Sequence, residues 1–266
     1  MTMASEFEAR RQIVEIGRRI WQRGYVAAND GNLSVRLDSG RILVTPTGVS
    51  KGFLDAADLV VVDPTGRKLS GSLEATSELA MHLFVYERRA DVSAVVHAHP
   101  PKATGFAVAG VPLAECILPE VILTLGQVPL ASYATPSTPE VSQSIETFIP
   151  TYNAMLLKNH GALALGGDIF EAYYRMETIE HFAEIMLTAR ALGGTTPLSR
   201  DEVTKLLRVR EKLGIGGSQG SADARQVCVT APETETPGAA GDKLTPDEES
   251  IVQAVLAEIR KGGRKA

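Results

Sequence analysis

The sequence predicts an α/β fold, and three observations support that prediction. Segments with helical periodicity alternate with short apolar runs along residues 4–213. Hydrophobic residues make up 44% of the 266 residues and charged residues 22%, which is typical of a globular chain. Residues 214–244 are instead rich in Gly, Ala, Ser, Thr and Pro, and such a segment buries too little apolar area to offset its ordering entropy. We therefore expect a globular domain over residues 1–213, a flexible linker over 214–244 and a terminal helix over 245–262.

Apolar residues at helical spacing predict the helices of the domain. Gly24 marks the end of the first helix, because glycine stops a helix readily. Asp168 suits the N-cap of the longest helix, since its carboxylate can accept a hydrogen bond from the first turn. In chain order, the expected helices cover residues 4–24, 75–90, 103–109, 139–148, 168–192 and 200–213.

Short apolar runs predict the strands. The first two runs flank Asp38-Ser39-Gly40, a typical hairpin turn, and the third ends at the turn of residues 63–66. The last two lie on either side of Asn159-His160-Gly161. In chain order, the expected strands cover residues 34–37, 41–44, 59–62, 93–99, 127–133, 154–158 and 162–165.

Composition argues against several classes of protein. No run of 18 apolar residues occurs, so a membrane-spanning helix is not expected, and residues 1–11 lack the apolar segment of a secretory signal. The net charge is −5 and the basic residues are interleaved with acids, which is unlike a nucleic-acid binder. The two cysteines, Cys116 and Cys228, do not make a disulfide framework. We therefore expect a cytoplasmic protein with no nucleic-acid partner.

Three of the five histidines are candidate metal ligands. His97 and His99 end an apolar strand, and His160 lies in a tight turn between two strands. Residues two apart on a strand normally face opposite ways, but a bend before Pro100-Pro101 can bring both imidazoles together. Three imidazoles and one open position make a catalytic zinc site. The alternative is two half-buried histidines and an unrelated turn histidine, and the His-x-His pattern alone favours that alternative.

A second group of candidates begins the helix expected over residues 75–90. Thr76 or Ser77 could cap that helix, with Glu78 as an acid of its first turn. Alternatively, the hydroxyls and helix-terminal N–H groups bind a phosphate, and Glu78 lies beside the metal as a base.

Two polar turns complete the set of candidates. Gly31-Asn32 and Thr47-Gly48 could be ordinary turn residues. Together with Thr76 and Ser77 they could form a neutral phosphate site, in which backbone N–H groups supply the positive ends of dipoles. Neither a Walker loop nor a GxGxxG motif occurs, so nucleotide binding is not expected.

These motifs occur together, in order, in a known family. The segments GNLSVRL and ILVTPTG, then ATSELAMHLFVYERRADVSAVVHAHP, then LLKNHG resemble the class II aldolase/adducin family over roughly residues 8–212. They look most like its L-fuculose-1-phosphate aldolase branch. The joint pattern is much more specific than any one segment. For the three histidines, it favours a metal site over the alternative of unrelated half-buried residues.

The resemblance implies a fold, a cofactor and a reaction. The implied fold is a three-layer α/β/α sandwich with a mainly antiparallel central sheet, assembled as a homotetramer with sites at subunit interfaces. One zinc ion per subunit, or another divalent metal such as Mn2+, would be held by His97, His99 and His160, with Glu78 as a further ligand and the general base. The reaction would cleave a ketose 1-phosphate to dihydroxyacetone phosphate and a small aldehyde such as lactaldehyde. The implied phosphate pocket comprises Gly31, Asn32, Thr47, Gly48, Thr76 and Ser77.

The sequence also departs from the family pattern. Family aldolases use a tyrosine of a neighbouring subunit as proton donor and a C-terminal tyrosine near the site, but this sequence has no tyrosine after Tyr174. Glu120 and Tyr133 are the candidate donors, and neither aligns cleanly. An epimerase or a dehydratase of the same family, and a non-catalytic adducin-like binding module, are therefore alternatives. Glu78 favours the aldolase over the epimerase, and the histidines argue against the binding module.

The tail after the linker has its own pattern. Thr245-Pro246-Asp247-Glu248 is a capping box, and an apolar stripe follows it at helical spacing. Such a helix could dock on its own tetramer or bind another protein. A linker followed by a short amphipathic helix resembles the encapsulation peptides of bacterial microcompartment enzymes. On that resemblance, residues 245–261 would bind a shell protein and place the enzyme in the compartment lumen.

Overall fold

The computed structural model of the chain describes residues 5–214. Both the expected terminal helix and nearly all of the expected linker lie outside the described residues, so these expectations and the boundary at residue 213 stay predictions. The contacts divide the chain into two compact units. Over the described residues, the first comprises residues 5–114 with Leu125–Thr196, and the second comprises Glu115–Thr124 with residues 197–214. Over residues 5–214, no helix combines the length and the apolar character needed to cross a membrane.

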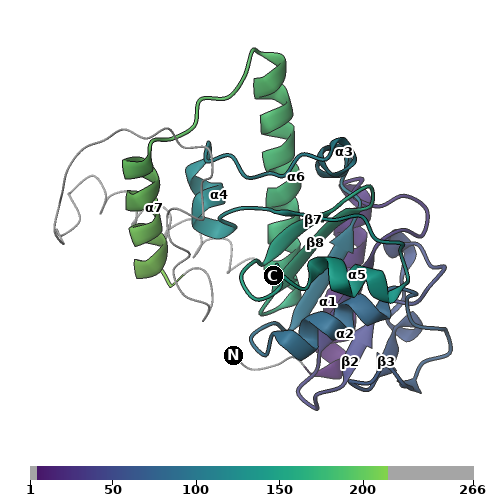
Figure 1. Ribbon diagram of the computed structural model, residues 1–266. Coiled ribbons are helices and arrows are strands. Elements are labelled where there is room, and N and C mark those ends of the chain that lie inside the picture. The colour runs from purple at the N-terminus through teal and green to yellow at the C-terminus, as the bar shows by residue number, and fades with distance from the viewer. Residues whose placement is uncertain (1–4, 215–266) are drawn as a thin grey trace. The chain divides into compact units, whose positions relative to one another are not determined.

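The first unit is built on an eight-stranded sheet (Figure 1). Its strand order is β4-β3-β2-β1-β5-β8-β7-β6, and every neighbouring pair is antiparallel except β6 with β7. The strands are β1 (Asn32–Arg36), β2 (Ile42–Val44), β3 (Val60–Val62), β4 (Lys68–Ser70), β5 (Ala94–Ala98), β6 (Leu130–Ala131), β7 (Ala154–Leu157) and β8 (Gly161–Gly166).

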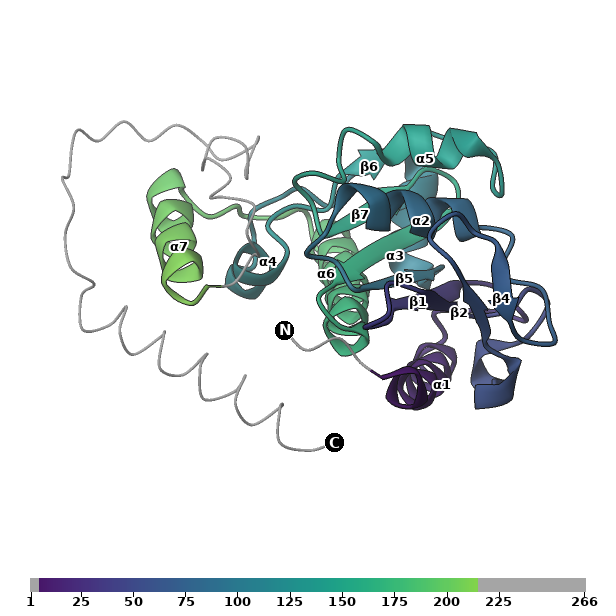
Figure 2. The same cartoon turned by 90° about the horizontal axis from the view of Figure 1, so that it is seen from below.

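Helices cover both faces of this sheet. Figure 2 shows α2 (Leu79–Arg88) and α5 (Pro139–Ile145) on one side, and α1 (Glu6–Gln22) and α6 (Ile169–Ala191) on the other. The helix α3 (Pro101–Ala109) packs on α6, and the short 3-10 helices η1 (Lys51–Phe53) and η2 (Ala56–Asp58) contact α1. The three-layer α/β/α fold with a mainly antiparallel sheet is therefore confirmed.

Most of the expected strands and α6 agree closely with expectation, because their cores are strongly apolar, whereas the strand expected over residues 127–133 is reduced to the two residues of β6. The hairpin pairs Ser34 with Val44, and Asp168 caps α6 by accepting a hydrogen bond from Glu171 N. The helix expected from residue 75 starts only at Leu79. Ala75 forms a β-bridge with Pro46 and Thr76 N donates to Thr45 O at 3.1 Å, so the chain makes a turn at Ser77 and Glu78 before the helix begins. No expectation covered β4, whose three residues are all exposed and so show no apolar run.

The second unit contains two described helices, α4 (Pro119–Thr124) and α7 (Arg200–Lys212). The start of α7 is fixed by a capping box between Ser199 and Glu202, which agrees with the helix expected there. Cys116, Ile122 and Val203 form its small apolar cluster. The sequence analysis missed α4, a helix of only 6 residues.

A buried carboxylate holds the start of α3, directly after His99. Glu180 of α6 accepts hydrogen bonds from Lys102 N and from Ala103 N, the latter at 2.9 Å. These N–H groups lack a partner within their own helix, and an anion is favourable at a helix N-terminus. Glu180 therefore fixes the course of the chain where it leaves β5.

We expect Glu180→Ala to lower the free energy of unfolding by about 2–3 kcal/mol, because two buried N–H groups lose a charged acceptor. Urea denaturation monitored by circular dichroism measures the change. Glu184→Ala is the matched control, one turn further along α6 and exposed, with only an ion pair to Lys102 at 3.5 Å. Equal losses in the two variants would contradict the capping role.

Candidate metal centre

The three candidate histidines lie together at one end of the central strands. His97 belongs to β5, His99 follows that strand directly, and His160 lies in the turn that joins β7 to β8. The ladder pairs Ala98 of β5 with Ala162 of β8, so the turn and the end of β5 are adjacent. The three ring centroids are 4.7–5.0 Å apart.

The strand ends in the way that lets both imidazoles converge. The ladder stops at Ala98, and His99 N donates instead to Tyr25 O at 2.8 Å. This bend places Nε2 of His99 only 3.1 Å from Nε2 of His97. One ring nitrogen from each of the three histidines lies within 4.8 Å of the other two. This is the one group of candidate metal-ligating side chains that the structure shows over its described residues.

Two glycines make room for this approach. A Cβ on Gly161 would lie 2.5 Å from Cδ2 of His99 and 2.6 Å from Ala98 O, which is too close. A Cβ on Gly31 would lie 2.8 Å from His97 O, and its φ of +70° is strained for other residues. A side chain at either position would therefore displace the histidines.

Hydrogen bonds orient the rings toward one another. Nδ1 of His97 donates to Ala162 O at 2.9 Å, because a carbonyl oxygen can only accept. Nδ1 of His99 lies 3.5 Å from the Asp30 carboxylate. Both rings therefore turn Nε2 inward, as metal-binding histidines do when their other nitrogen has a fixed acceptor. Burial, with a contribution from the charge of His97, lowers the pKa of His99 and of His160 to about 4, which leaves these rings neutral at pH 7.

Glu78, the N-cap residue of α2, also belongs to the cluster. Its Oε2 accepts from Nδ2 of Asn32 at 2.8 Å and lies 3.2 Å from Nε2 of His97. Its Oε1 lies 3.5 Å from Nε2 of His160 and is buried without a hydrogen-bond partner among the described residues. Burial alone would raise the pKa of Glu78, but His97, Asn32 and His160 outweigh it and hold this pKa far below its usual range.

This donor set fits a divalent cation. An ionised carboxylate with one unpaired buried oxygen is costly unless a cation lies against it. Glu78 in turn raises the pKa of His97 against the effect of burial, so a proton on His97 balances the carboxylate charge. A cation between the three Nε2 atoms and Glu78 would replace that proton, and imidazole and carboxylate donors suit zinc.

The predicted phosphate residues also come together. Thr45 links their segments: its Oγ1 accepts from Leu33 N at 3.1 Å and its carbonyl accepts from Thr76 N at 3.1 Å. Among the hydrogen bonds of the described residues, neither Gly48 N nor Ser77 N is a donor, and both residues are exposed. These two N–H groups are therefore free to bind an anion. Gly31 and Asn32 stand at the start of β1, beside His97 in the register.

Lys51 follows the Thr47-Gly48 turn in the sequence, which does not indicate its role, and the structure places it between the two polar turns. Its side chain is buried, and Nζ donates to Asn29 O and to Val49 O, both at 2.8 Å. Asn29 precedes Gly31-Asn32, and Val49 follows Thr47-Gly48. Lys51 thus joins the two turns. Burial lowers the pKa of Lys51 to about 8, so the ammonium remains mostly charged at pH 7.

The two candidate proton donors are not part of the described cluster. Tyr133 is exposed and follows β6, and no described contact joins it to the histidines. Glu120 lies in α4 of the second unit. Asp30 was also missed, although its place beside Gly31-Asn32 was a usable signal.

Comparisons with known proteins agree with this geometry. The model of the Class II Aldolase and Adducin N-terminal domain matches residues 11–187. An L-fuculose phosphate aldolase of Methanococcus maripaludis is 34% identical over 174 residues, which cover 65% of this chain and 93% of that protein. A 3-oxo-tetronate 4-phosphate decarboxylase of Pectobacterium atrosepticum is 33% identical over 189 residues, which cover 70% of this chain and 86% of that protein.

A solved structure shares the fold. YgbL from Klebsiella pneumoniae, described as an aldolase, epimerase or decarboxylase, matches with a TM-score of 0.70 and 34% identity. The match covers 76% of this chain and 99% of YgbL.

Proposed function

Because the chain belongs to the class II aldolase and adducin family, we propose that it is a metal-dependent lyase that cleaves a carbon–carbon bond of a phosphorylated ketose. L-fuculose 1-phosphate, or a similar ketose 1-phosphate, is the first candidate substrate. The observation that carries the proposal is the Glu78 carboxylate beside the three converging imidazoles: its Oε1 is buried without a hydrogen-bond partner among the described residues and lies 3.5 Å from Nε2 of His160.

His97, His99 and His160 would hold the cation, with Glu78 as a fourth ligand before substrate binds. Zinc is the first candidate, and Mn2+ the second. A bound divalent cation supplies a Lewis acid beside the substrate carbonyl. Glu78 would take the proton from the hydroxyl next to the bond that breaks, which is general-base catalysis by an ionised carboxylate. The protonated Glu78 would then return that proton to the carbon of the dihydroxyacetone phosphate half, which keeps the electron pair of the broken bond.

The polar turns would bind the phosphate and so set the position of the carbonyl. The N–H groups of Gly48 and Ser77 donate to it, and the side chains of Asn32, Thr47 and Thr76 line the same site. A neutral site of this kind binds a phosphate dianion through oriented dipoles rather than through ion pairs. Gly31 would contribute through its lack of a side chain, which allows β1 to begin against the His97 backbone.

A decarboxylase is the second candidate, because a relative with this activity matches a similar share of the chain. Its substrate and a ketose 1-phosphate share one half: a phosphate on a methylene, a carbonyl and a hydroxyl-bearing carbon. Breaking the bond beyond that carbon releases dihydroxyacetone phosphate in both cases. Loss of carbon dioxide removes no hydroxyl proton, and the carbon that loses it would take up a proton from water. This reaction therefore needs Glu78 less as a base than the release of an aldehyde does.

A substrate panel tests both candidates. Zinc-reconstituted protein is given L-fuculose 1-phosphate, L-rhamnulose 1-phosphate and 3-oxo-tetronate 4-phosphate, and dihydroxyacetone phosphate is followed with a coupled dehydrogenase. The co-product, aldehyde or labelled carbon dioxide, separates aldolase from decarboxylase. Epimerised or dehydrated product would favour the other family reactions. Absence of stoichiometric metal and of any turnover would favour an adducin-like binding module and overturn the proposal.

The proposal includes a cytoplasmic homotetramer, which sedimentation of the purified protein would test. The interpretation of residues 245–261 as a ligand for a microcompartment shell protein rests on the sequence alone and stays a prediction.

Lys51 provides a test of the phosphate site. We expect Lys51→Met to weaken inhibition by inorganic phosphate about tenfold, because the buried ammonium no longer holds the Asn29 and Val49 carbonyls together. The inhibition constant and the zinc content are both measured, and the zinc content should not change. Lys68→Met, at an exposed lysine of β4, is the control. Equal inhibition constants in the two variants would contradict the role of Lys51.

A further inference from the structure

A chain of buried hydrogen bonds leads from Glu78 into the protein interior. Asn32 Nδ2 bonds Oε2 of Glu78 at 2.8 Å, and Asn32 Oδ1 bonds Nε2 of His82. Nδ1 of His82 lies 2.6 Å from Oγ of Ser34, which lies 2.7 Å from the hydroxyl of Tyr86. Asn32, Ser34, His82 and Tyr86 are all buried.

The secondary structure explains this alignment. Glu78, His82 and Tyr86 are spaced by four residues at the start of α2 and along it, so they lie on one face of that helix. Asn32 and Ser34 are two residues apart on β1, so they lie on one face of the sheet. One helical stripe therefore faces one strand, and their polar groups alternate along the contact.

The donor and the acceptor of every bond in this chain are determined. Asn32 presents its NH2 group to Oε2 of Glu78, and an NH2 group can only donate, so the Asn32 carbonyl is the acceptor that faces His82. Nε2 of His82 must then carry the proton. Burial, with a contribution from the charge of His97, lowers the pKa of His82 to about 3, so the ring is neutral and its Nδ1 accepts from Ser34. Ser34 in turn accepts from Tyr86, whose pKa is raised by burial and whose hydroxyl stays protonated.

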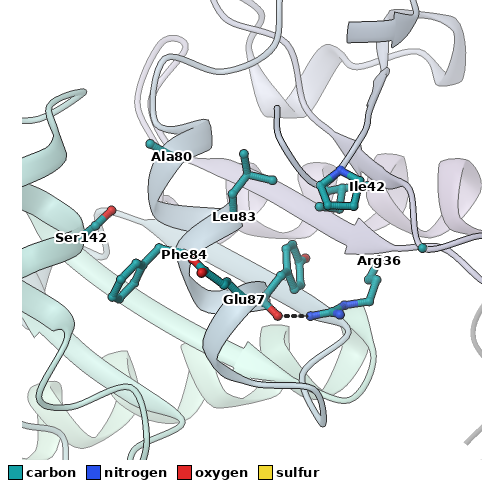
Figure 3. Close-up of a pocket in the computed structure, with 10 residues that line it drawn as sticks. Arg36, Ile42, Ala80, Leu83, Phe84, Glu87 and Ser142 are labelled. Carbon is teal, nitrogen blue, oxygen red and sulfur yellow. Dashed lines mark hydrogen bonds between the residues drawn. The ribbon is translucent and has the colours of Figure 1, made fainter. Parts of the chain in front are cut away.

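The far end of the chain is held in place as well. The guanidinium of Arg36 lies 4.9 Å from the centre of the Tyr86 ring, and Nη2 donates to the Tyr86 carbonyl, the dashed bond in Figure 3. Arg36 and Tyr86 line a cavity of about 490 Å3 together with Leu83, Phe84 and Glu87 of α2. No residue of the histidine cluster lines this cavity, so Tyr86 is fixed from a separate part of the unit.

We propose that His82 is a positioning residue that fixes the Asn32 amide and, through it, the Glu78 carboxylate. With the His82 proton in place, a flipped amide would set a carbonyl oxygen against the carboxylate and an NH2 group against an N–H. Only one orientation avoids both repulsions. Oε2 of Glu78 is thereby held, and Oε1 is the oxygen left to face the cation. The inference rests on the proposed function, since it assigns this series of hydrogen bonds to the support of the proposed metal site.

A pair of substitutions of similar shape isolates the His82 proton. His82→Gln keeps an N–H donor that can reach Oδ1 of Asn32, whereas His82→Met keeps a similar length and has no donor. Each protein is freed of metal and titrated with Co2+ in competition with a chelator. We expect His82→Met to bind Co2+ about 10–100-fold more weakly than wild type, and His82→Gln to recover most of the affinity.

The Co2+ absorption spectrum adds a readout that a merely structural role would not move. We expect the spectrum of His82→Met to shift toward that of Glu78→Gln, because in both variants the carboxylate is no longer held against the cation. If His82→Met does not fold, Tyr86→Phe replaces it, with Tyr152→Phe as control in the same apolar cluster. Tyr86→Phe is then expected to bind Co2+ about threefold or more weakly than its control.

The outcomes separate the two proposals. Wild-type affinity and an unshifted spectrum in His82→Met, or in Tyr86→Phe where His82→Met is unfolded, would overturn the role of His82 alone. Equal losses in His82→Gln and His82→Met would also overturn it, because the proton would not be the cause. If wild-type protein fails to bind one Co2+ per subunit, the proposed function fails and this inference fails with it.

Discussion

Replacing His97 by alanine is expected to abolish metal binding and turnover. His97 is fully buried, and its Nε2 lies between Nε2 of His99 and Oε2 of Glu78. The cation would lose one of the three converging imidazoles that hold it, so the affinity for zinc falls steeply. We expect less than about one tenth of the wild-type zinc content after dialysis, and no measurable release of dihydroxyacetone phosphate. His160→Ala should give the same result.

Zinc content by atomic emission and a coupled assay measure the two effects on one preparation. His181→Ala is the control, because His181 is exposed on α6. Circular dichroism separates loss of metal from loss of fold. Near-normal zinc content or turnover in His97→Ala would refute the metal assignment.

The fold was largely predictable because its signals are local. The apolar run at β5, the hairpin turn at residues 38–40 and the Asp168 cap each act within a few residues of their own position. The start of α2 was not predictable from helical periodicity. Its delay to Leu79 depends on Thr76 N pairing with Thr45 O, across 31 positions of sequence, and no local pattern reports such a bond.

The site divides in the same way. The motif resemblance brought His97, His99, His160 and Glu78 to attention, and the structure places their ligand atoms together. Lys51 was named but not understood, because its role depends on two backbone carbonyls in separate turns. The sequence alone gives His82 no specific role, and the structure shows it bonded to Asn32 and Ser34. These hydrogen bonds become visible only when the structure places α2 beside β1.

The phosphate half of the substrate and the leaving half pose different demands on this chain. In the proposed reactions, the polar turns and the histidines would act on the half that becomes dihydroxyacetone phosphate, which an aldolase and a decarboxylase share. The leaving half differs between the two reactions, and the candidate donor Tyr133 makes no described contact with the histidines. The family motifs therefore predict the bond type that breaks better than they predict the product that leaves.

Glu78→Gln is expected to lower kcat at least a hundredfold while the protein keeps part of its zinc. The amide oxygen of glutamine can still accept from Nδ2 of Asn32, and the three imidazoles remain, but the amide cannot take a proton from the substrate hydroxyl. A hundredfold loss corresponds to about 2.7 kcal/mol of the barrier, within the range for general-base catalysis. The rate is measured on L-fuculose 1-phosphate with saturating zinc, and zinc content is measured in parallel. Glu74→Gln is the matched control, four residues earlier and exposed, where the carboxylate pairs with Lys68. If kcat of Glu78→Gln stays within tenfold of that control, the loss is less than about 1.4 kcal/mol of barrier, which is too small for the loss of a general base. Another residue would then take the proton, or the reaction would be one that removes no hydroxyl proton, such as decarboxylation.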